Sequence, residues 1–168
     1  MSNKLYKIIA INPGSRYIGV AVFYGNALQD WHIKNVPGRP EKQRLAKAKY
    51  IILRLIERHE PDMIVLKKLH PSKTSIPLKR TTNLIEKLAY QRKIRIRKYS
   101  IKQVKDLILN DKPKNKARLA EVLANRYPDL MHEFKKEILS KNHYHIRMFE
   151  AVALGAICCD QLSGFRGE

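Results

Sequence analysis

Two short segments of the chain carry enough Lys and Arg side chains to bind phosphate groups. In the first, residues 92–99, the sequence alternates, so that Lys93, Arg95, Arg97 and Tyr99 would share one face of a β-strand. Guanidinium groups at this density can make charge-assisted contacts with phosphate oxygens. The same charges could instead keep an edge strand from pairing with another sheet. We therefore predict an edge or half-open strand with one basic face.

The second segment, residues 111–116, is a basic loop that opens a predicted helix and contains Lys112, Lys114 and Lys116. The free N–H groups of a helix N-terminus and nearby ammonium groups can converge on one phosphate. Further along, His143 and His145 have no cysteine or carboxylate at the usual spacing of zinc ligands. We expect the two histidines to cap a helix or contact phosphate, and we expect no metal site.

Cysteine chemistry is not expected either. Cys158 and Cys159 are adjacent inside the apolar run 151–159, and neighbouring helix positions point apart. A disulfide between them would need strained geometry. Both are predicted to be reduced residues of the core.

The charge of the whole chain favours nucleic acid as the partner. Its 168 residues include 34 Lys or Arg and 15 Asp or Glu, a formal net charge of +19 at pH 7. These cations are spread over strands, loops and helices, which suits a phosphate backbone better than a membrane surface. No apolar run approaches the roughly 18 residues that span a bilayer, and no signal peptide is evident. We expect a cytoplasmic protein with one globular domain over residues 1–168.

The elements that must position these side chains begin with three β-rich runs separated by turn signals, which predicts an antiparallel meander. The runs are residues 8–11, 17–24 and 28–36, and the turns are residues 12–16 and 25–26.

A helix with one apolar face follows over residues 42–60 and ends at Pro61. The short apolar run 63–69 comes directly after this helix, so we expect a strand parallel to the first. Residues 128–142 have no clear assignment. The other predicted elements are a helix over 78–92, a strand over 94–99, helices over 101–109 and 114–126, and a last helix from about 145.

Residues 8–21, Ile-Ile-Ala-Ile-Asn-Pro-Gly-Ser-Arg-Tyr-Ile-Gly-Val-Ala, resemble the first hairpin of Holliday-junction resolvases of the RuvC type, in the RNase H-like superfamily. The resolvase pattern there is apolar-apolar-Gly-Ile-Asp-Pro-Gly-Ser-Arg. The resemblance continues through residues 60–69, 99–105 and 150–153 in the same order. It implies an RNase H-like, three-layer α/β fold. Its mixed five-stranded sheet, an antiparallel meander followed by parallel strands, would be flanked by helices.

The resemblance also identifies positions where the metal ligands of a nuclease would be. The resemblance implies that phosphodiesters are cut with two divalent metals, held by four acidic residues or by three acidic residues and a histidine. In this sequence the matching positions are Asn12, Lys67, Arg147 and Glu150, and only Glu150 is a carboxylate. Their formal charges add to +1, so the set repels Mg²⁺. The resemblance therefore predicts that fixed side-chain cations replace the metals, with phosphate binding kept and cutting lost.

Other interpretations of these residues stay open. Lys67 and Lys68 could be a solvated strand end, and Arg147 with Glu150 a surface ion pair. The chain could also be an active endonuclease with an atypical ligand set, and only then would it need Mg²⁺ or Mn²⁺ as a cofactor. Actin-like ATPases and sugar kinases bind phosphate at a similar hairpin, but they need two such domains.

Lys105 and Lys116 match lysines that resolvases direct at the junction backbone, with the same number of residues between them. The Gly- and Ala-rich helix with which resolvases dimerise is replaced by Leu-Lys-Arg-Thr-Thr-Asn at residues 78–83, which leaves a homodimer and junction specificity open. Several of the basic residues lie in loops that could simply be solvated. The residues we expect to contact nucleic acid are Arg16, Lys73, Lys79, Arg80, Arg95, Arg97, Lys105, Lys112, Lys114 and Lys116.

The sequence thus predicts a RuvC-like pseudoenzyme that binds branched or structured DNA through its phosphate backbone, as a relative of nucleases that act in DNA recombination.

Overall fold

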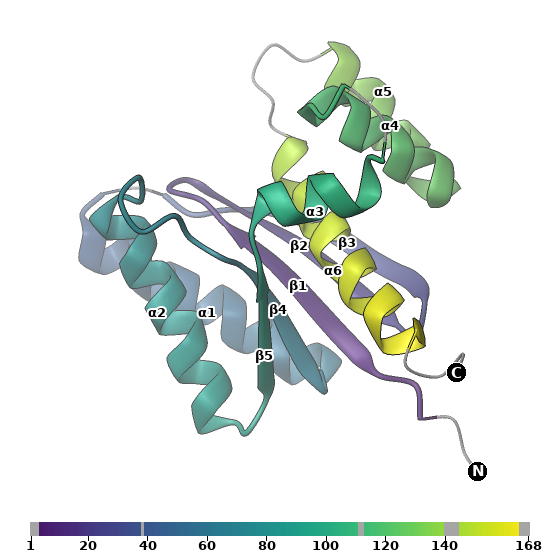
Figure 1. Ribbon diagram of the computed structural model, residues 1–168. Helices are drawn as coiled ribbons and strands as arrows, with labels where there is room; N and C mark the ends of the chain where they lie inside the picture. The colour runs from purple at the N-terminus through teal and green to yellow at the C-terminus, as the bar shows by residue number, and fades with distance from the viewer. Residues whose placement is uncertain (1–3, 38, 111–112, 140–144, 165–168) are drawn as a thin grey trace.

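The computed structural model describes residues 4–37, 39–110, 113–139 and 145–164, and helices cover both faces of its sheet (Figure 1). In chain order the elements are β1 (Lys7–Pro13), β2 (Tyr17–Tyr24), β3 (Ala27–Asn35), α1 (Glu41–His59), β4 (Met63–Lys67), α2 (Ile76–Gln91), β5 (Arg95–Tyr99), α3 (Ile101–Ile108), α4 (Lys116–Arg126), a 3-10 turn (Pro128–Leu130), α5 (Met131–Leu139) and α6 (Ile146–Gly164).

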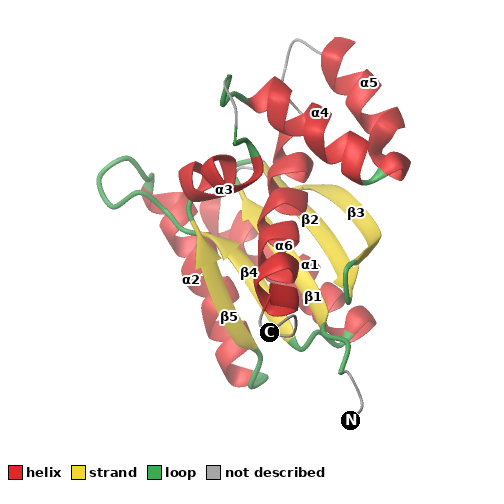
Figure 2. Ribbon diagram, turned by 45° about the vertical axis from the view of Figure 1, so that its right-hand side comes forward, coloured by secondary structure: helices red, strands yellow, loops and turns green. Residues whose placement is uncertain are grey.

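The five strands form one mixed sheet with the order β3-β2-β1-β4-β5 (Figure 2). β1 pairs antiparallel with β2, and β2 pairs antiparallel with β3. β4 is parallel to both β1 and β5. The predicted mixed sheet is confirmed, and β5 lies at its edge as the alternating sequence indicated.

Alternate side chains of the central strands pack into two separate cores. Ile9 and Ile11 of β1 lie with residues of α1 and α2, whereas Ile8 and Ala10 lie with residues of α6. A fully buried Ile contributes about 1.5–3 kcal/mol, so this alternation fixes the register. A slip of one residue would turn Asn12, which follows the same alternation, away from α6.

The predicted elements are confirmed in type and order, while several of their ends differ. α4 begins at Lys116 and not at 114, because the side chain of Asn115 caps it by accepting a hydrogen bond from the Arg118 N–H. Ser75 caps α2 in the same way, so this helix begins at Ile76, two residues before the expected start at 78. The 3-10 turn and α5 lie in the part of the sequence that had no assignment.

No helix in the described part of the chain is both long and apolar enough to cross a membrane.

The first turn of α6 packs directly on β2 at Gly19. A Cβ atom at this position would overlap the carbonyl group of Arg147 and approach the N–H of Met148. Only a residue without a side chain lets the helix backbone come this close to the strand. The lack of a side chain at Gly19 therefore determines how closely α6 approaches the end of β1 and the start of β2.

We expect Gly19→Ala to lower the free energy of unfolding by about 3 kcal/mol or more, since the clash involves backbone and cannot be relieved by a rotamer change. Chemical denaturation measures this effect. Gly164→Ala is the matched control, because no described atom lies within 4 Å of a Cβ at Gly164. Equal stability of the two variants would show that α6 does not depend on this contact.

Candidate functional site

Asn12 and Lys67 are neighbours at the carboxyl ends of the parallel strands β1 and β4. The ladder between these strands pairs Ile11 with Leu66, so Asn12 and Lys67 are the next residue on each strand. Ala10 on β1 and Val65 on β4 face α6. Asn12 and Lys67 come two residues later on the same strands, so their side chains face α6 as well. The sheet thus places an amide and an ammonium group side by side beneath the start of α6.

Arg147 lies over the turn between β1 and β2. The Nδ2 of Asn12 donates a hydrogen bond of 3.2 Å to the carbonyl oxygen of Arg147. A Cβ atom at Gly14 would lie 2.9 Å from the Arg147 Cζ, so the guanidinium group covers that turn. The Oδ1 of Asn12 is buried without a hydrogen-bond partner in the described structure. Asn12 therefore anchors the helix and keeps one acceptor unused.

Lys67 is half-buried and surrounded by charges from three helices. Burial lowers its pKa from the ordinary value of 10.5, the Glu150 carboxylate acts in the opposite sense, and the cations of Arg147, Lys116 and Lys105 lower it further. Residues from β4, α3, α4 and α6 therefore lie within electrostatic reach of one another. We call Asn12, Lys67, Arg147 and Glu150, together with Lys105 and Lys116, the cationic site.

The cations of this site are not neutralised by close ion pairs. Within the described residues, no carboxylate lies within 4.0 Å of the side-chain nitrogens of Lys67, Lys105, Lys116 or Arg147. Glu150 is only 4% exposed, so the surface ion pair between Arg147 and Glu150 considered from sequence is not formed. An excess of positive charge therefore remains at the strand ends.

Other predicted contact residues are already paired. Arg80 donates to Glu41 over 2.5 Å, and Lys114 donates to Asp106 over 3.0 Å. Arg97 interacts with the Tyr99 hydroxyl and lies near the Cys158 thiol, and these neighbours raise its pKa. Arg16, Lys73, Lys79 and Arg95 are exposed away from such partners, and Lys112 lies outside the described residues.

His145 is tied to α5 at the start of α6. Its backbone N–H donates to Glu137 Oε2 over 3.0 Å, and its Nε2 lies 3.2 Å from Glu133 Oε2. Sequence reasoning missed Glu133 and Glu137 because α5 had no recognisable pattern. His143 lies outside the described residues. Within the described part of the chain, no three His, Cys, Asp or Glu side chains are close enough together to hold a metal ion.

Both cysteines are free and buried in α6, as predicted. Burial raises the pKa of the Cys158 thiol and raises that of Cys159 to about 12. Neither is a thiolate at neutral pH, so they contribute no nucleophile to the site.

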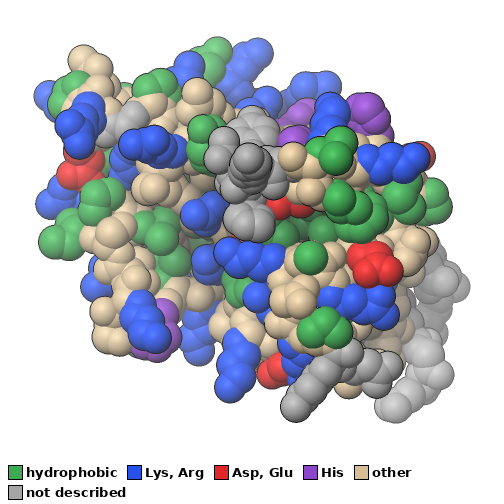
Figure 3. All heavy atoms as spheres, turned by 90° about the horizontal axis from the view of Figure 1, so that it is seen from above, with side chains coloured by type: hydrophobic (Ala, Val, Ile, Leu, Met, Phe, Trp, Pro, Cys, Tyr) green, Lys and Arg blue, Asp and Glu red, His purple; other side chains and the backbone are tan. Residues whose placement is uncertain are grey.

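Basic side chains spread over the whole end of the molecule at which β1, β4 and β5 finish. Figure 3 views this end, and Lys and Arg side chains outnumber the few acidic ones across it. The cationic site therefore belongs to a wider positive surface.

Solved structures of Holliday junction resolvases share this fold. A Thermus thermophilus RuvC structure aligns with a TM-score of 0.68 and 15% sequence identity, over 94% of this chain and 96% of that one. RuvC of T. thermophilus in complex with Holliday junction substrate aligns with a TM-score of 0.65 and 15% identity, over 89% of each chain. The Fowlpox virus resolvase in complex with Holliday junction DNA gives a TM-score of 0.59 and 15% identity, over 93% and 98%.

These matches confirm the predicted RNase H-like fold of the RuvC type. No protein-family model matches the sequence, and no curated protein matches it.

We expect Lys67→Met to raise the melting temperature at pH 7, because the folded environment disfavours the charged ammonium group. The lowered pKa means that the unfolded chain binds more protons than the folded one between the lowered value and the ordinary value of 10.5. Wild-type stability therefore recovers relative to Lys67→Met as pH rises through this window. Thermal unfolding at several pH values measures the difference.

Lys47→Met, at an exposed position of α1, serves as the control and should change little at any pH. A Lys67→Met variant that is less stable at pH 7 and gains relative to wild type at higher pH would contradict the expected sign.

Proposed function

We propose that this chain binds branched DNA through its phosphate backbone at the cationic site and does not cut it. The observation that carries the proposal is the group of unpaired cations at the ends of β1 and β4. Lys67 and Arg147 come from different elements, and no carboxylate lies within 4.0 Å of either in the described residues. Phosphate oxygens are the ligands that such a group of ammonium and guanidinium donors suits best.

The electrostatics of Lys67 also support an anionic ligand. Its pKa is lowered by burial and by the cations of Arg147, Lys116 and Lys105. A phosphate placed among these groups would offset their mutual repulsion and restore the charged form of Lys67. Binding and protonation of this lysine are therefore coupled, and affinity falls as pH rises through its lowered pKa.

The donor set does not fit the two metal ions that resolvases of this fold class imply. Mg²⁺ needs a near-octahedral shell of oxygen ligands, with anionic oxygens to offset its charge. The four matching positions offer one carboxylate, Glu150, and one amide oxygen, the unpartnered Oδ1 of Asn12. The ammonium of Lys67 and the guanidinium of Arg147 repel a divalent cation. We infer that the chain holds a phosphodiester without activating water against it.

Branched DNA is the proposed ligand because of what the similar structures contain. RuvC and the Fowlpox virus resolvase were both solved with Holliday junction DNA. The shared fold covers most of this chain, which supports a surface for the same kind of ligand at its strand ends. The high net charge of +19 supports contact with several phosphates.

The double variant Lys105→Ala/Lys116→Ala should bind a labelled four-way junction more weakly than wild type. Each lost phosphate contact lowers the slope of log affinity against log salt concentration by about 0.9, so the slope should fall by about 2. Fluorescence anisotropy at several salt concentrations gives both quantities. A duplex of equal length tests whether the junction is preferred.

Lys87→Ala/Arg92→Ala is the matched control, because it removes two exposed cations from the far end of α2, at the opposite end of the sheet. If this control lowers junction affinity and salt slope as much as the site variant, binding is a general effect of charge and the proposed site is wrong.

The wild-type chain should leave the junction uncut in Mg²⁺ or Mn²⁺. The triple variant Asn12→Asp/Lys67→Glu/Arg147→Asp should gain affinity for these ions, because it changes the formal charge of the four matching positions from +1 to −4. Calorimetry measures metal binding, and circular dichroism confirms that the variant is folded. Metal-dependent cleavage by wild type that Glu150→Ala abolishes would overturn the proposal. A folded triple variant that ignores both ions would show that these positions are not the ligand positions.

A further inference from the structure

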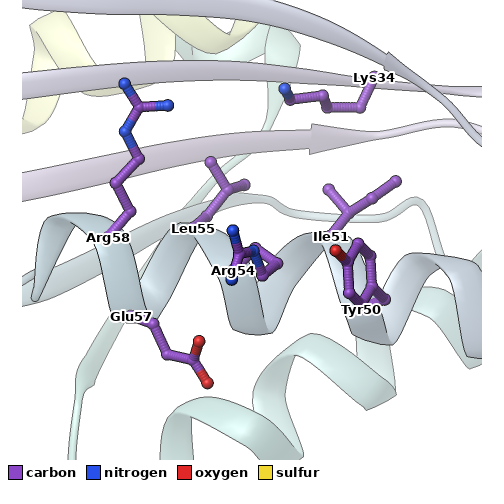
Figure 4. Close-up of a pocket in the computed structure, with 7 residues that line it drawn as sticks. All are labelled: Lys34, Tyr50, Ile51, Arg54, Leu55, Glu57 and Arg58. Carbon is purple, nitrogen blue, oxygen red and sulfur yellow. The ribbon is translucent and has the colours of Figure 1, made fainter.

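A groove of about 480 Å³ lies between the edge strand β3 and helix α1 (Figure 4). Its rim carries Lys34 from β3 and Tyr50, Arg54 and Arg58 from α1, with Ile51 and Leu55 beneath them. The groove is on the α1 face of the sheet, whereas the cationic site is on the α6 face. It is therefore a separate surface.

The cations of the groove have no acidic partner of their own. No carboxylate in the described residues lies within 4.0 Å of the side-chain nitrogens of Lys34, Arg54 or Arg58. Glu57 also lines the groove, but its side chain points away from the strands, so three cations stand against one carboxylate (Figure 4). Lys34 and Arg58 lie on the strand side of the helix, above Leu55. The groove is thus positively charged and suits an anionic ligand.

The helix side of the groove has a regular spacing. Tyr50, Arg54 and Arg58 are four residues apart in turn, which places them in one line along α1, with neighbouring Cβ atoms about 5–6 Å apart. Tyr50 is 59% exposed, so its ring is accessible. An aromatic face followed by evenly spaced cations is the combination with which proteins bind single-stranded nucleic acid.

An acidic peptide fits this surface less well. Peptides that dock in grooves anchor themselves with apolar side chains in hydrophobic pockets. Ile51 and Leu55 beneath the rim are only 9% and 6% exposed, so these two side chains offer little apolar area to such anchors. The accessible features are the charges and the ring. A paired duplex would not offer its base faces to Tyr50.

We propose that the groove between β3 and α1 binds a single-stranded segment of nucleic acid, with a base stacked on Tyr50 and phosphates held by Arg54, Arg58 and Lys34. This surface is distinct from the cationic site, and the proposal does not depend on junction binding. The chain then has two nucleic-acid surfaces, one on each face of its sheet.

Anisotropy of a labelled oligothymidine of about 15 nucleotides tests the proposal. Tyr50→Ala should weaken binding at least fivefold, roughly the value of one lost stacking contact, while Tyr50→Phe keeps the ring and wild-type affinity. Arg54→Ala/Arg58→Ala should lower the salt slope by about 1.4, or 0.7 for each phosphate contact. Thermal unfolding of each variant should match wild type, because these side chains lie on the surface.

The control is Lys87→Ala/Arg92→Ala, which removes two exposed cations outside both surfaces and should bind oligothymidine as wild type does. Loss of oligothymidine binding in Lys105→Ala/Lys116→Ala but not in the groove variants would assign the strand to the cationic site and overturn the proposal, without affecting junction binding there. Tyr50→Ala and Tyr50→Phe with equal affinity, or no oligothymidine binding at all, would also overturn it. So would binding of a poly-glutamate peptide that the groove variants lose while oligothymidine binding is unchanged.

Discussion

The position of α6 on the ends of β1 and β2 depends on a hydrogen bond from a buried amide. Asn12 is 0% exposed, and its Nδ2 donates to the carbonyl oxygen of Arg147. An ionised aspartate at this position has no donor and would repel that carbonyl. Asn12 therefore has a structural role, because it holds the helix start at the place where Gly19 lets the two backbones meet. In a chain with aspartate here, a bound cation would have to supply the attraction that this amide now provides.

The same arrangement sets the charge balance of the cationic site. Lys67 is half-buried next to a helix that carries Arg147, and the cations of α3 and α4 add to the unfavourable potential at its ammonium group. Glu150, itself buried, supplies the opposing charge. A buried cation without full compensation reduces stability. The repulsion among these cations therefore destabilises the folded site, and a bound phosphate would relieve that repulsion. The stability of this region is thus linked to its proposed ligand.

The sequence could predict the sheet because its alternation is strong and its turns are marked by Gly and Pro. It did not predict α5, because apolar and charged residues are mixed there: Met131 and Phe134 pack against the core, while the charged Glu137 is buried and the apolar Ile138 and Leu139 are exposed. Local caps shifted helix starts by one or two residues, as Asn115 does for α4. The pairing of Arg80 with Glu41 joins residues 39 positions apart. No local sequence pattern could therefore distinguish Arg80, which is paired, from cations that are unpaired. Lys34 belonged to no motif, and its groove was missed for that reason.

The two proposed surfaces reach the same end of the sheet on opposite faces. In the ladders, Lys34 of β3 pairs with Ile18 of β2, and Ile18 pairs with Pro13, the residue after Asn12. The groove therefore begins at the same level as the cationic site and continues down the α1 face, past the edge of β3. β3 has no further strand beside it, so a nucleic-acid strand can pass around this edge without crossing the sheet. Under the two proposals together, a ligand with a backbone over the cationic site and an unpaired strand leaving it would engage both surfaces, whereas a continuous duplex, which is stiff and keeps its bases stacked, would engage only one.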